Sequence, residues 1–386
     1  MKFLFIVQGE GRGHFTQALT MSEMLRERGD QVVGVLVGKS AHRQLPGFFT
    51  EKIQAPVSTF ESPNFLPTPQ NKRPELFRSI RANAGKLPVF CRSIRFIRQN
   101  IEDLQPDIVI NFYELLTGFT YLFMPPGVPQ VCIGHQYMFL HKDFEFPAHA
   151  SWWQLASLRF FSRMTSIGAV RRLALSFYPA ASDEEEGITV VPPLIRKEVR
   201  RIPVKDGDYL LGYMLNSGYV SEVAEWSDQH PEVPLHFFWD KKEAPEISAY
   251  SDRLTLHRIN DTVFVQYMAG CRAYSTTAGF ESVCEALYLR KPVLMVPAHI
   301  EQECNAWDAF SVGAGVMAAR FDLSLLQEFL PYYQPVSGFS SWADKAESRI
   351  CAELDAAWQP SSAYRIYDRL YQACNIRNLI YKAGAC

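Results

Sequence analysis

Small and polar side chains gather in residues 272–306, in an order that suits a phosphorylated ligand. A run predicted to be a strand gives way to Thr277, Ala278 and Gly279, which are small enough for a ligand to approach the backbone. Apolar residues at helical spacing follow, so a helix is expected to begin here. Its first-turn N–H groups and its dipole would favour an anion, most obviously a phosphate.

Carboxylates and amides complete the pattern. Glu285 follows Glu281 by four residues, a like-charge spacing that slightly destabilises an isolated helix. Glu285 is therefore either a solvated carboxylate or an acceptor for a sugar's vicinal hydroxyls, as carboxylates serve the ribose in nucleotide folds. Glu301, Gln302 and Asn305 cluster just past the next predicted strand, where they suit a polyhydroxy ligand. The stretch thus predicts a βαβ unit with a ligand at its strand ends.

A second candidate site lies near the amino terminus, in the glycine-rich turn QGEGRGH at residues 8–14. A strand is predicted for residues 2–7 and an amphipathic helix from Phe15 to Arg28. The glycines follow G-x-G-x-G, whereas dinucleotide folds use G-x-G-x-x-G, and no acid ends the second strand at residues 31–37. An NADP enzyme using Lys39 and Arg43 remains a minor alternative.

His14 closes this turn at the mouth of the first strand. An imidazole with a pKa near neutrality can take a proton from an attacking hydroxyl. Glu10 has three interpretations: a second base, a partner that orients His14, or a solvated loop carboxylate.

The order G-x-x-S-x-x-E-A-L, K-P, V-P and E-Q-x-x-N-A resembles the donor-binding segment of GT-B nucleotide-sugar glycosyltransferases. It is similar to the MurG-like branch and its uncharacterised bacterial relatives. Thr277 departs from the His that many members of the superfamily carry. The matching residues are Gly279, Ser282, Glu285, Ala286, Pro292, Pro297, Glu301, Gln302, Asn305 and Ala306.

The resemblance implies roles for individual residues. Glu285 would hold the ribose, and Glu301 with Gln302 would contact the donor sugar. His14 would lie next to the reacting centre. Main chain at Ile259 would contact the base, and the turn Asn216, Ser217 and Gly218 would hold the diphosphate. The residues expected on the acceptor side are Gly11, Gly13, His135 and Gln136.

Length and composition fit this architecture. At 386 residues the chain exceeds what one core usually holds. We expect an α/β fold of two Rossmann-like domains facing a cleft. Residues 1–195 would bind the acceptor and 204–358 the nucleotide sugar, and a helix in 359–386 would pack back on the first domain. Eight cysteines without a C-x-x-C pair, and no run of about 20 apolar residues, favour a cytoplasmic protein with reduced thiols.

Charge is distributed unevenly. Residues 1–203 hold 24 Lys and Arg against 18 Asp and Glu, and the remainder holds 15 against 23. Two stretches of the basic half, residues 78–98 and 152–177, mix arginines with aromatic residues. They are either core helices or surfaces for an anionic membrane. The membrane interpretation predicts salt-sensitive vesicle binding that charge reversal weakens at Arg92, Arg95, Arg171 and Arg172.

These features predict a glycosyltransferase of the hexosyltransferase type that uses a UDP-linked sugar and a hydroxyl acceptor. One candidate acceptor is a lipid-linked or cell-envelope molecule at the inner face of the membrane. The resemblance implies inversion, and the lack of a D-x-D pair at a strand end argues against a metal. No cofactor and no nucleic-acid partner are expected. The alternatives are a UDP-sugar 2-epimerase of the same fold and a non-catalytic nucleotide-sugar-binding protein.

Overall fold

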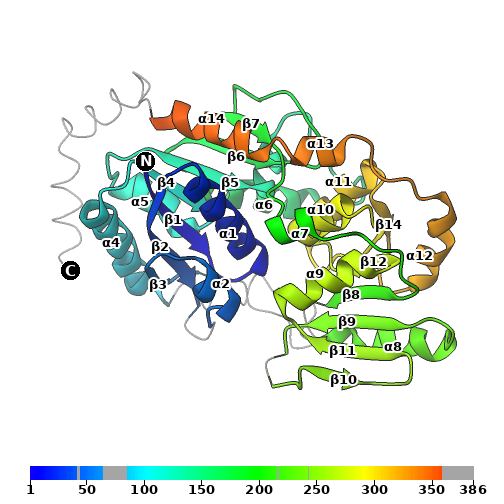
Figure 1. Ribbon diagram of the computed structural model, residues 1–386. Coiled ribbons are helices and arrows are strands. Elements are labelled where there is room, and N and C mark those ends of the chain that lie inside the picture. The colour runs from blue at the N-terminus through cyan, green and yellow to red at the C-terminus, as the bar shows by residue number, and fades with distance from the viewer. Residues whose placement is uncertain (41–43, 64–84, 215–216, 242, 359–386) are drawn as a thin grey trace.

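Two seven-stranded sheets, each covered by helices, form the framework of the molecule (Figure 1). The computed structural model describes residues 1–40, 44–63, 85–214, 217–241 and 243–358. The first sheet is parallel, in the order β3-β2-β1-β4-β5-β6-β7. Its strands are β1 (Lys2–Gln8), β2 (Gln31–Lys39), β3 (Val57–Glu61), β4 (Ile108–Phe112), β5 (Gln130–Gly134), β6 (Ala169–Leu175) and β7 (Ile188–Val191).

The second sheet has the order β10-β11-β9-β8-β12-β13-β14. Its pairs are parallel except for the edge strand β10, which runs antiparallel to β11. Its strands are β8 (Leu210–Met214), β9 (Leu235–Trp239), β10 (Ile247–Ala249), β11 (Leu254–Arg258), β12 (Ala273–Thr276), β13 (Val293–Met295) and β14 (Gly315–Met317). Both sheets are doubly wound, as the predicted fold class requires.

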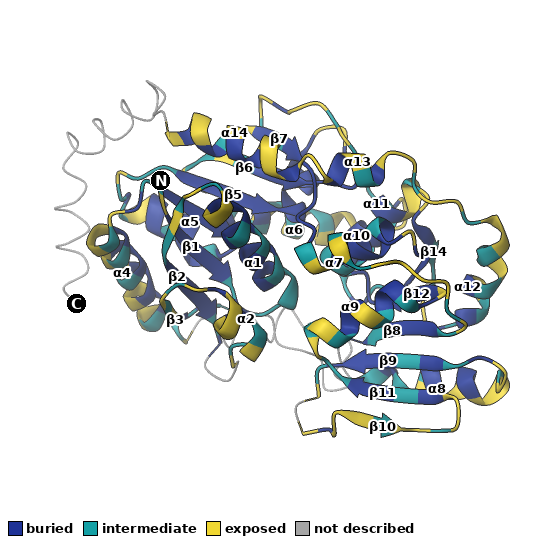
Figure 2. Cartoon of the chain, viewed as in Figure 1, coloured by how far each residue is buried: buried dark blue, intermediate teal, exposed yellow. Residues whose placement is uncertain are grey.

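Short apolar runs become central strands because helices cover both faces of a parallel sheet. Residues 3–7 of β1, for example, are fully buried, and Figure 2 shows exposed residues mainly on helices and loops. The helices of the first domain are α1 (Arg12–Glu27), α2 (Gly47–Lys52), α4 (Leu87–Leu104), α5 (Leu115–Phe123), the 3-10 helix η1 (His135–Leu140) and α6 (Trp152–Thr165).

Strand order reverses next to β1 in the first sheet and next to β8 in the second. Ligands of doubly wound folds bind at such reversal points. The helices after β7 are α7 (Lys197–Arg201), η2 (Ser217–Tyr219), α8 (Val220–Gln229), α9 (Asp261–Gly270), α10 (Phe280–Tyr288), α11 (Ile300–Ser311), α12 (Leu323–Phe329), η3 (Leu330–Tyr332), α13 (Phe339–Ala343) and α14 (Ala346–Trp358).

The chain crosses between the sheets twice. The first crossing runs from Val191 to Leu210 through α7 and contains the expected boundary between residues 195 and 204. The second leads to α14, which packs against β4, β6 and β7 of the first sheet. The domain division expected from the sequence, with residues 204–358 in the second domain, includes this helix there. The expected helix in 359–386 lies outside the described residues.

The stretch 152–177 is not one amphipathic segment. Helix α6 ends at Thr165, and Arg171 and Arg172 lie in strand β6. Arg171 pairs with Glu353 at 3.4 Å, and Arg172 donates to the hydroxyl of Ser166 at 2.8 Å. These two arginines therefore lie in a strand of the sheet and not on the predicted amphipathic helix.

Candidate active site

A cavity of about 1720 Å³ opens between the two domains and is lined by residues from both. Helix α1 follows β1, and α10 follows β12. Their N-cap residues, Gly11 and Gly279, supply no capping side chain. Both helices therefore direct first-turn N–H donors toward the cavity, an arrangement that binds anions.

The turn into α10 is held in an uncommon backbone shape. Ala278 has φ of 61°, in the left-handed region, and its carbonyl accepts a hydrogen bond from Asn305 at 3.3 Å. Ser282 donates its hydroxyl to the carbonyl of Gly279 at 3.2 Å. Thr277, Gly279 and Ser282 line the cavity, whereas Ala278 is buried behind them. Left-handed alanine is strained, and such strain is often found at ligand sites.

Glu285 lies in the cavity wall with a partner that the sequence did not reveal. Arg196, from the linker before α7, donates to both of its carboxylate oxygens, at 2.5 and 2.7 Å. Glu285 is only 2% exposed, so the interpretation as a solvated carboxylate is wrong. Burial lowers the pKa of Arg196, but Glu285 raises it more, and the guanidinium stays charged. Two of the oxygen lone pairs expected for a ribose are thus already used.

The polar side chains of α11 meet the cavity at its rim. Glu301 accepts a hydrogen bond from Gln136 of the first domain at 2.9 Å. Gln302 accepts one from the backbone N–H of Ala298 at 2.9 Å. The buried side-chain oxygen of Asn305 has no hydrogen-bond partner within the described residues. Glu301, Gln302 and Asn305 of α11 and Gln136 of the first domain all line the cavity.

His14 lies inside the first turn of α1, since this helix begins at Arg12 and not at Phe15. Its ring stacks on Tyr113 with centroids 5.9 Å apart, and its Nδ1 is buried without a partner in the described structure. Burial lowers the pKa of His14, while Glu301 and Gln17 act in the opposite direction. The neutral ring that faces the cavity is therefore a proton acceptor at neutral pH.

Glu10 also lines the cavity, and its carboxylate accepts the backbone N–H of Ser40 at 2.7 Å. No described contact joins it to His14, so its role as an orienting partner of His14 is not supported by this geometry.

Gly11 and Gly13 both line the cavity. At Gly13 the space is taken by Glu281, because a Cβ added to Gly13 would collide with that carboxylate. Glu281 also accepts a hydrogen bond from Gln17 of α1. Glu281 was not predicted as a site residue, because its first-turn position is explained by the helix dipole alone.

His135 does not line the cavity, which contradicts its predicted place beside the acceptor. Its ring is 1% exposed and stacks on Phe280 of the second domain, with centroids 4.1 Å apart. Its Nδ1 bonds the carbonyl of Leu175 at 2.7 Å. Burial lowers the pKa of His135 to about 4 and raises that of neighbouring Asp308 to about 7, so the pair joins the domains without a charged imidazole at neutral pH.

The other residues predicted to bind the donor lie in two segments that follow strands. Ile259 lines the cavity, and its N–H donates to the carbonyl of Trp239 at 2.9 Å. Ser217 and Gly218 lie in η2, and Gly218 is not part of the described lining. Asn216 lies outside the described residues.

One end of the cavity is apolar and was not predicted. It is walled by α4, α5 and α6. The most exposed apolar side chains of this wall are Leu87 at 62%, Trp153 at 67% and Phe160 at 63%. The other apolar residues of this wall are Phe90, Ile94, Leu116, Phe119, Phe123, Leu158 and Phe161.

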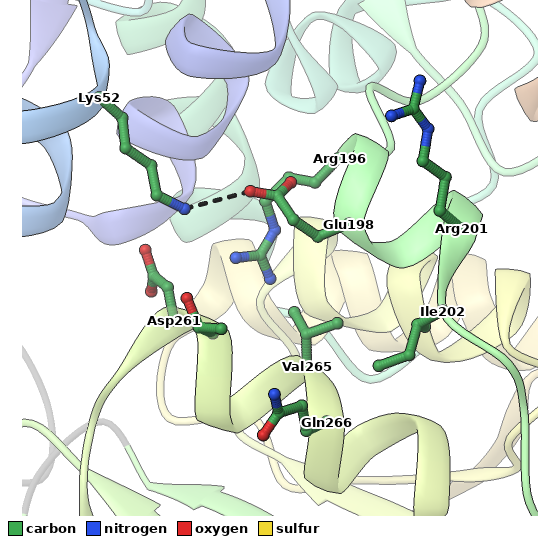
Figure 3. A pocket seen from close by; sticks show the side chains of 9 residues that line it. Lys52, Arg196, Glu198, Arg201, Ile202, Asp261, Val265 and Gln266 are labelled. Atoms are coloured by element: carbon green, nitrogen blue, oxygen red, sulfur yellow. Dashed lines mark hydrogen bonds and ion pairs between the residues drawn. The ribbon is translucent and has the colours of Figure 1, made fainter.

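A second, smaller cavity of about 270 Å³ is lined in part by Arg196 and Asp261, which also line the main cavity (Figure 3). Lys52 reaches across it from the first domain to Glu198 at 3.1 Å. A further bridge joins Arg12 to Asp261 at 2.8 Å. The linker is thus tied to both domains beside the main cavity.

Among the described residues no group of three or more His, Cys, Asp and Glu side chains could hold a metal ion. No helix in the same residues is long and apolar enough to cross a membrane.

Two doubly wound domains with a cavity at both reversal points define the GT-B class of glycosyltransferases. A family model described as Glycosyl transferase family 1 matches residues 1–333, and the chain belongs to this family. The protein is a glycosyltransferase, as predicted. The MurG-like branch is not among these findings, and no curated protein matches the sequence.

Similar solved structures share the fold. The glycosyltransferase of kitacinnamycin is 15% identical, with a TM-score of 0.62 over 93% of this chain and 99% of that one. A UDP-glucosyltransferase from Polygonum tinctorium that glucosylates indoxyl is 14% identical, with a TM-score of 0.62 over 93% and 99%. A Listeria monocytogenes protein assigned to the UDP-N-acetylglucosamine 2-epimerases is 13% identical, with a TM-score of 0.59 over 94% and 97%.

Proposed function

We propose that the protein transfers a sugar from a UDP-linked donor to a hydroxyl group of a lipid-linked acceptor, with inversion and without a metal ion or another cofactor. The observation that carries this proposal is the two-ended cavity. Its polar end holds the start of α10 and the side chains of α11, and its other end is an apolar wall. An epimerase needs no acceptor and hence no such wall.

The donor would lie along the polar end. Its diphosphate would face the first-turn N–H groups of α10, its ribose would face Glu285, and its sugar would face Glu301 and Gln302. Charge builds on the leaving diphosphate as the bond to the anomeric carbon breaks. Fixed N–H donors at that place stabilise it without reorganisation.

The acceptor hydroxyl would be held beside His14. Its oxygen attacks the anomeric carbon from the face opposite the diphosphate, and its proton passes to the imidazole. The buried Nδ1 without a partner in the described residues supports this role, because it leaves one ring nitrogen available. Positioned proton transfer of this kind usually contributes a factor of about 10²–10⁴ to the rate.

The apolar wall supports an acceptor with a large apolar body. Leu87, Trp153 and Phe160 would be costly to expose without a ligand or surface to cover them. The neighbour from Polygonum tinctorium glucosylates indoxyl, which shows that this fold accepts an aromatic acceptor. A lipid-linked acceptor adds a reason for the rim residues to be apolar as well.

Contact with an anionic membrane would then use α4 and α6 together. Arg92 and Arg95 are exposed on α4, and each cation near anionic lipid contributes about 1 kcal/mol. Charge reversal of both to Glu should weaken flotation with anionic vesicles at low salt. The same change at Arg253, exposed in the second domain, is the control. Wild-type protein that floats equally with neutral and anionic vesicles, or with neither, would contradict the membrane contact.

The donor class is tested by thermal shift with a panel of nucleoside diphosphates and nucleotide sugars. UDP and one or more UDP-sugars should raise the melting temperature more than the corresponding GDP and dTDP compounds. A shift by none of the panel would contradict the proposed function.

A further inference from the structure

Among the described charged residues that line the cavity expected to receive a diphosphate, acids outnumber bases. Among its described lining residues two are arginines, and both are already paired, Arg12 with Asp261 and Arg196 with Glu285. The other carboxylates of the lining are Glu10, Glu281, Glu301 and Glu303. A donor that brings two negative charges into this cavity therefore meets carboxylates without new cations to offset them.

Glu281 is the acid closest to the expected diphosphate position, because it lies in the first turn of α10. Its carboxyl group is enclosed between the two helix starts, against Gly13 and Gln17 of α1. Ionised, it would repel the diphosphate at short range. Neutral, it has an O–H donor in a wall that otherwise offers backbone N–H groups.

We propose that Glu281 binds a proton together with the donor: the neutral carboxyl donates a hydrogen bond to the diphosphate, and product release returns the proton to solvent. This inference rests on the proposed function, since it needs a nucleotide diphosphate at the start of α10. It assigns to Glu281 a part in donor binding that neither the sequence pattern nor the family assignment gives.

The surroundings of Glu281 bring the pKa of its carboxyl close to neutral pH, where donor binding can change its protonation. Burial raises its pKa to about 7, with Glu301 and Glu285 adding to the increase and the hydrogen bond from Gln17 opposing it. The charged groups that act on it are Glu301 on α11 and Glu285 on its own helix. Other titratable or charged residues of the same cavity lining are Arg12 and His14 on α1, Asp261 on α9 and His299 before α11. Two nearby phosphate charges would raise the pKa further, because like charges disfavour the ionised form.

Calorimetry of donor binding in buffers with different ionisation enthalpies measures the protons taken up. The probe is the tightest-binding member of UDP-, GDP- and dTDP-glucose, whose diester phosphates do not titrate near neutral pH. If the pKa rises by two units in the complex, wild-type protein should take up about 0.7 proton at pH 7.5. Its affinity should fall up to about tenfold per pH unit above pH 7.

Glu281→Gln should abolish both the uptake and the pH dependence, since an amide keeps a donor but does not titrate. Glu303→Gln is the matched control, because Glu303 is also a first-turn glutamate of the lining but pairs with His149 at 2.7 Å. It should keep the wild-type uptake. Thermal melts establish that both variants fold, and a chelator in every buffer excludes a metal ion as the counter-charge.

Three outcomes overturn the inference. Proton uptake of zero in the wild type, or equal uptake in wild type and Glu281→Gln, contradicts it while leaving the proposed function intact. Uptake lost equally in Glu303→Gln contradicts the assignment to Glu281. No binding by any member of the panel contradicts the proposed function itself, and this inference with it.

Discussion

At the scale of single residues, His14 carries the proposed chemistry. His14→Ala removes the proton acceptor but none of the groups assigned to the donor. Turnover should fall about 10²–10³-fold, while the dissociation constant of the UDP-sugar should change less than about threefold. Single-turnover rates and calorimetry measure the two quantities. If donor affinity falls in step with turnover, His14 binds the donor and Glu10 becomes the candidate base.

The pKa of His14 should also determine the pH below which activity declines. Burial lowers the pKa of His14 from its ordinary 6.5, so the ring keeps its basic form as the pH falls through that value. At saturating donor, the ratio kcat/KM for the acceptor should therefore show no decline on the acid side until the pH falls below 6.5. A half-maximal point above pH 6.5 would show that another group, or a His14 in a different setting, limits the rate.

Glu285 combines a predicted binding role with a structural one. Glu285→Gln should weaken nucleoside diphosphate binding by about 1–3 kcal/mol. It should also lower the free energy of unfolding by about 3 kcal/mol, because Arg196 is left buried beside a neutral group. The double variant Arg196→Gln, Glu285→Gln should recover part of that stability. Unchanged affinity in calorimetry would remove Glu285 from the ribose site.

At the scale of elements, helix α6 carries two adjacent tryptophans, of which one lines the cavity and the other does not. Trp153 lines the cavity, whereas Trp152 is 76% exposed and is not in the described lining. Trp153→Ser should raise the KM for an apolar acceptor about tenfold and leave the donor KM unchanged, since a buried aromatic side chain contributes roughly 1.5–3 kcal/mol. Trp152→Ser should match the wild type. Equal effects of both changes would place the acceptor elsewhere.

Elements with a strong local pattern were predictable, and those defined by distant contacts were not. The strands β1, β2 and β12 follow short apolar runs whose ends are marked by polar residues, and each ends within two residues of its expected position. Strand β6 was missed because its adjacent arginines Arg171 and Arg172 imitate an amphipathic helix surface. Arg171 pairs with Glu353, which is distant in the sequence, whereas Arg172 bonds Ser166 six residues before it.

The site residues also divide into those that local sequence motifs predicted and those brought together by distant contacts. Local motifs identified the residues at the start of α10, but Arg196 lies 89 residues before its partner Glu285, and Gln17 reaches Glu281 across 264 positions. No spacing rule joins such pairs. His135 was misplaced for a related reason: polar residues after a strand end predicted the cavity, while the fold stacks this ring on Phe280.

At the scale of the whole molecule, α14 ties the two domains together. Leu354 is fully buried and belongs to the core cluster that spans both sheets. Leu354→Ala should lower the free energy of unfolding by about 2–5 kcal/mol through loss of apolar contact and the cavity left behind. Denaturant unfolding followed by fluorescence and circular dichroism should remain one coincident transition. Two separated transitions in the wild type would show that the domains unfold independently.

The most direct measurement of the central claim compares two acceptors that differ only in their apolar part. Release of nucleoside diphosphate from the best UDP-sugar is followed with dodecyl β-glucoside, methyl β-glucoside or no acceptor, with each below its aggregation limit. We predict release that depends on acceptor and is at least tenfold faster with the dodecyl compound, together with a glycosylated product seen by mass spectrometry. Equal release without acceptor, or equal rates with the two glucosides, would contradict a transferase whose acceptor is held by the apolar wall.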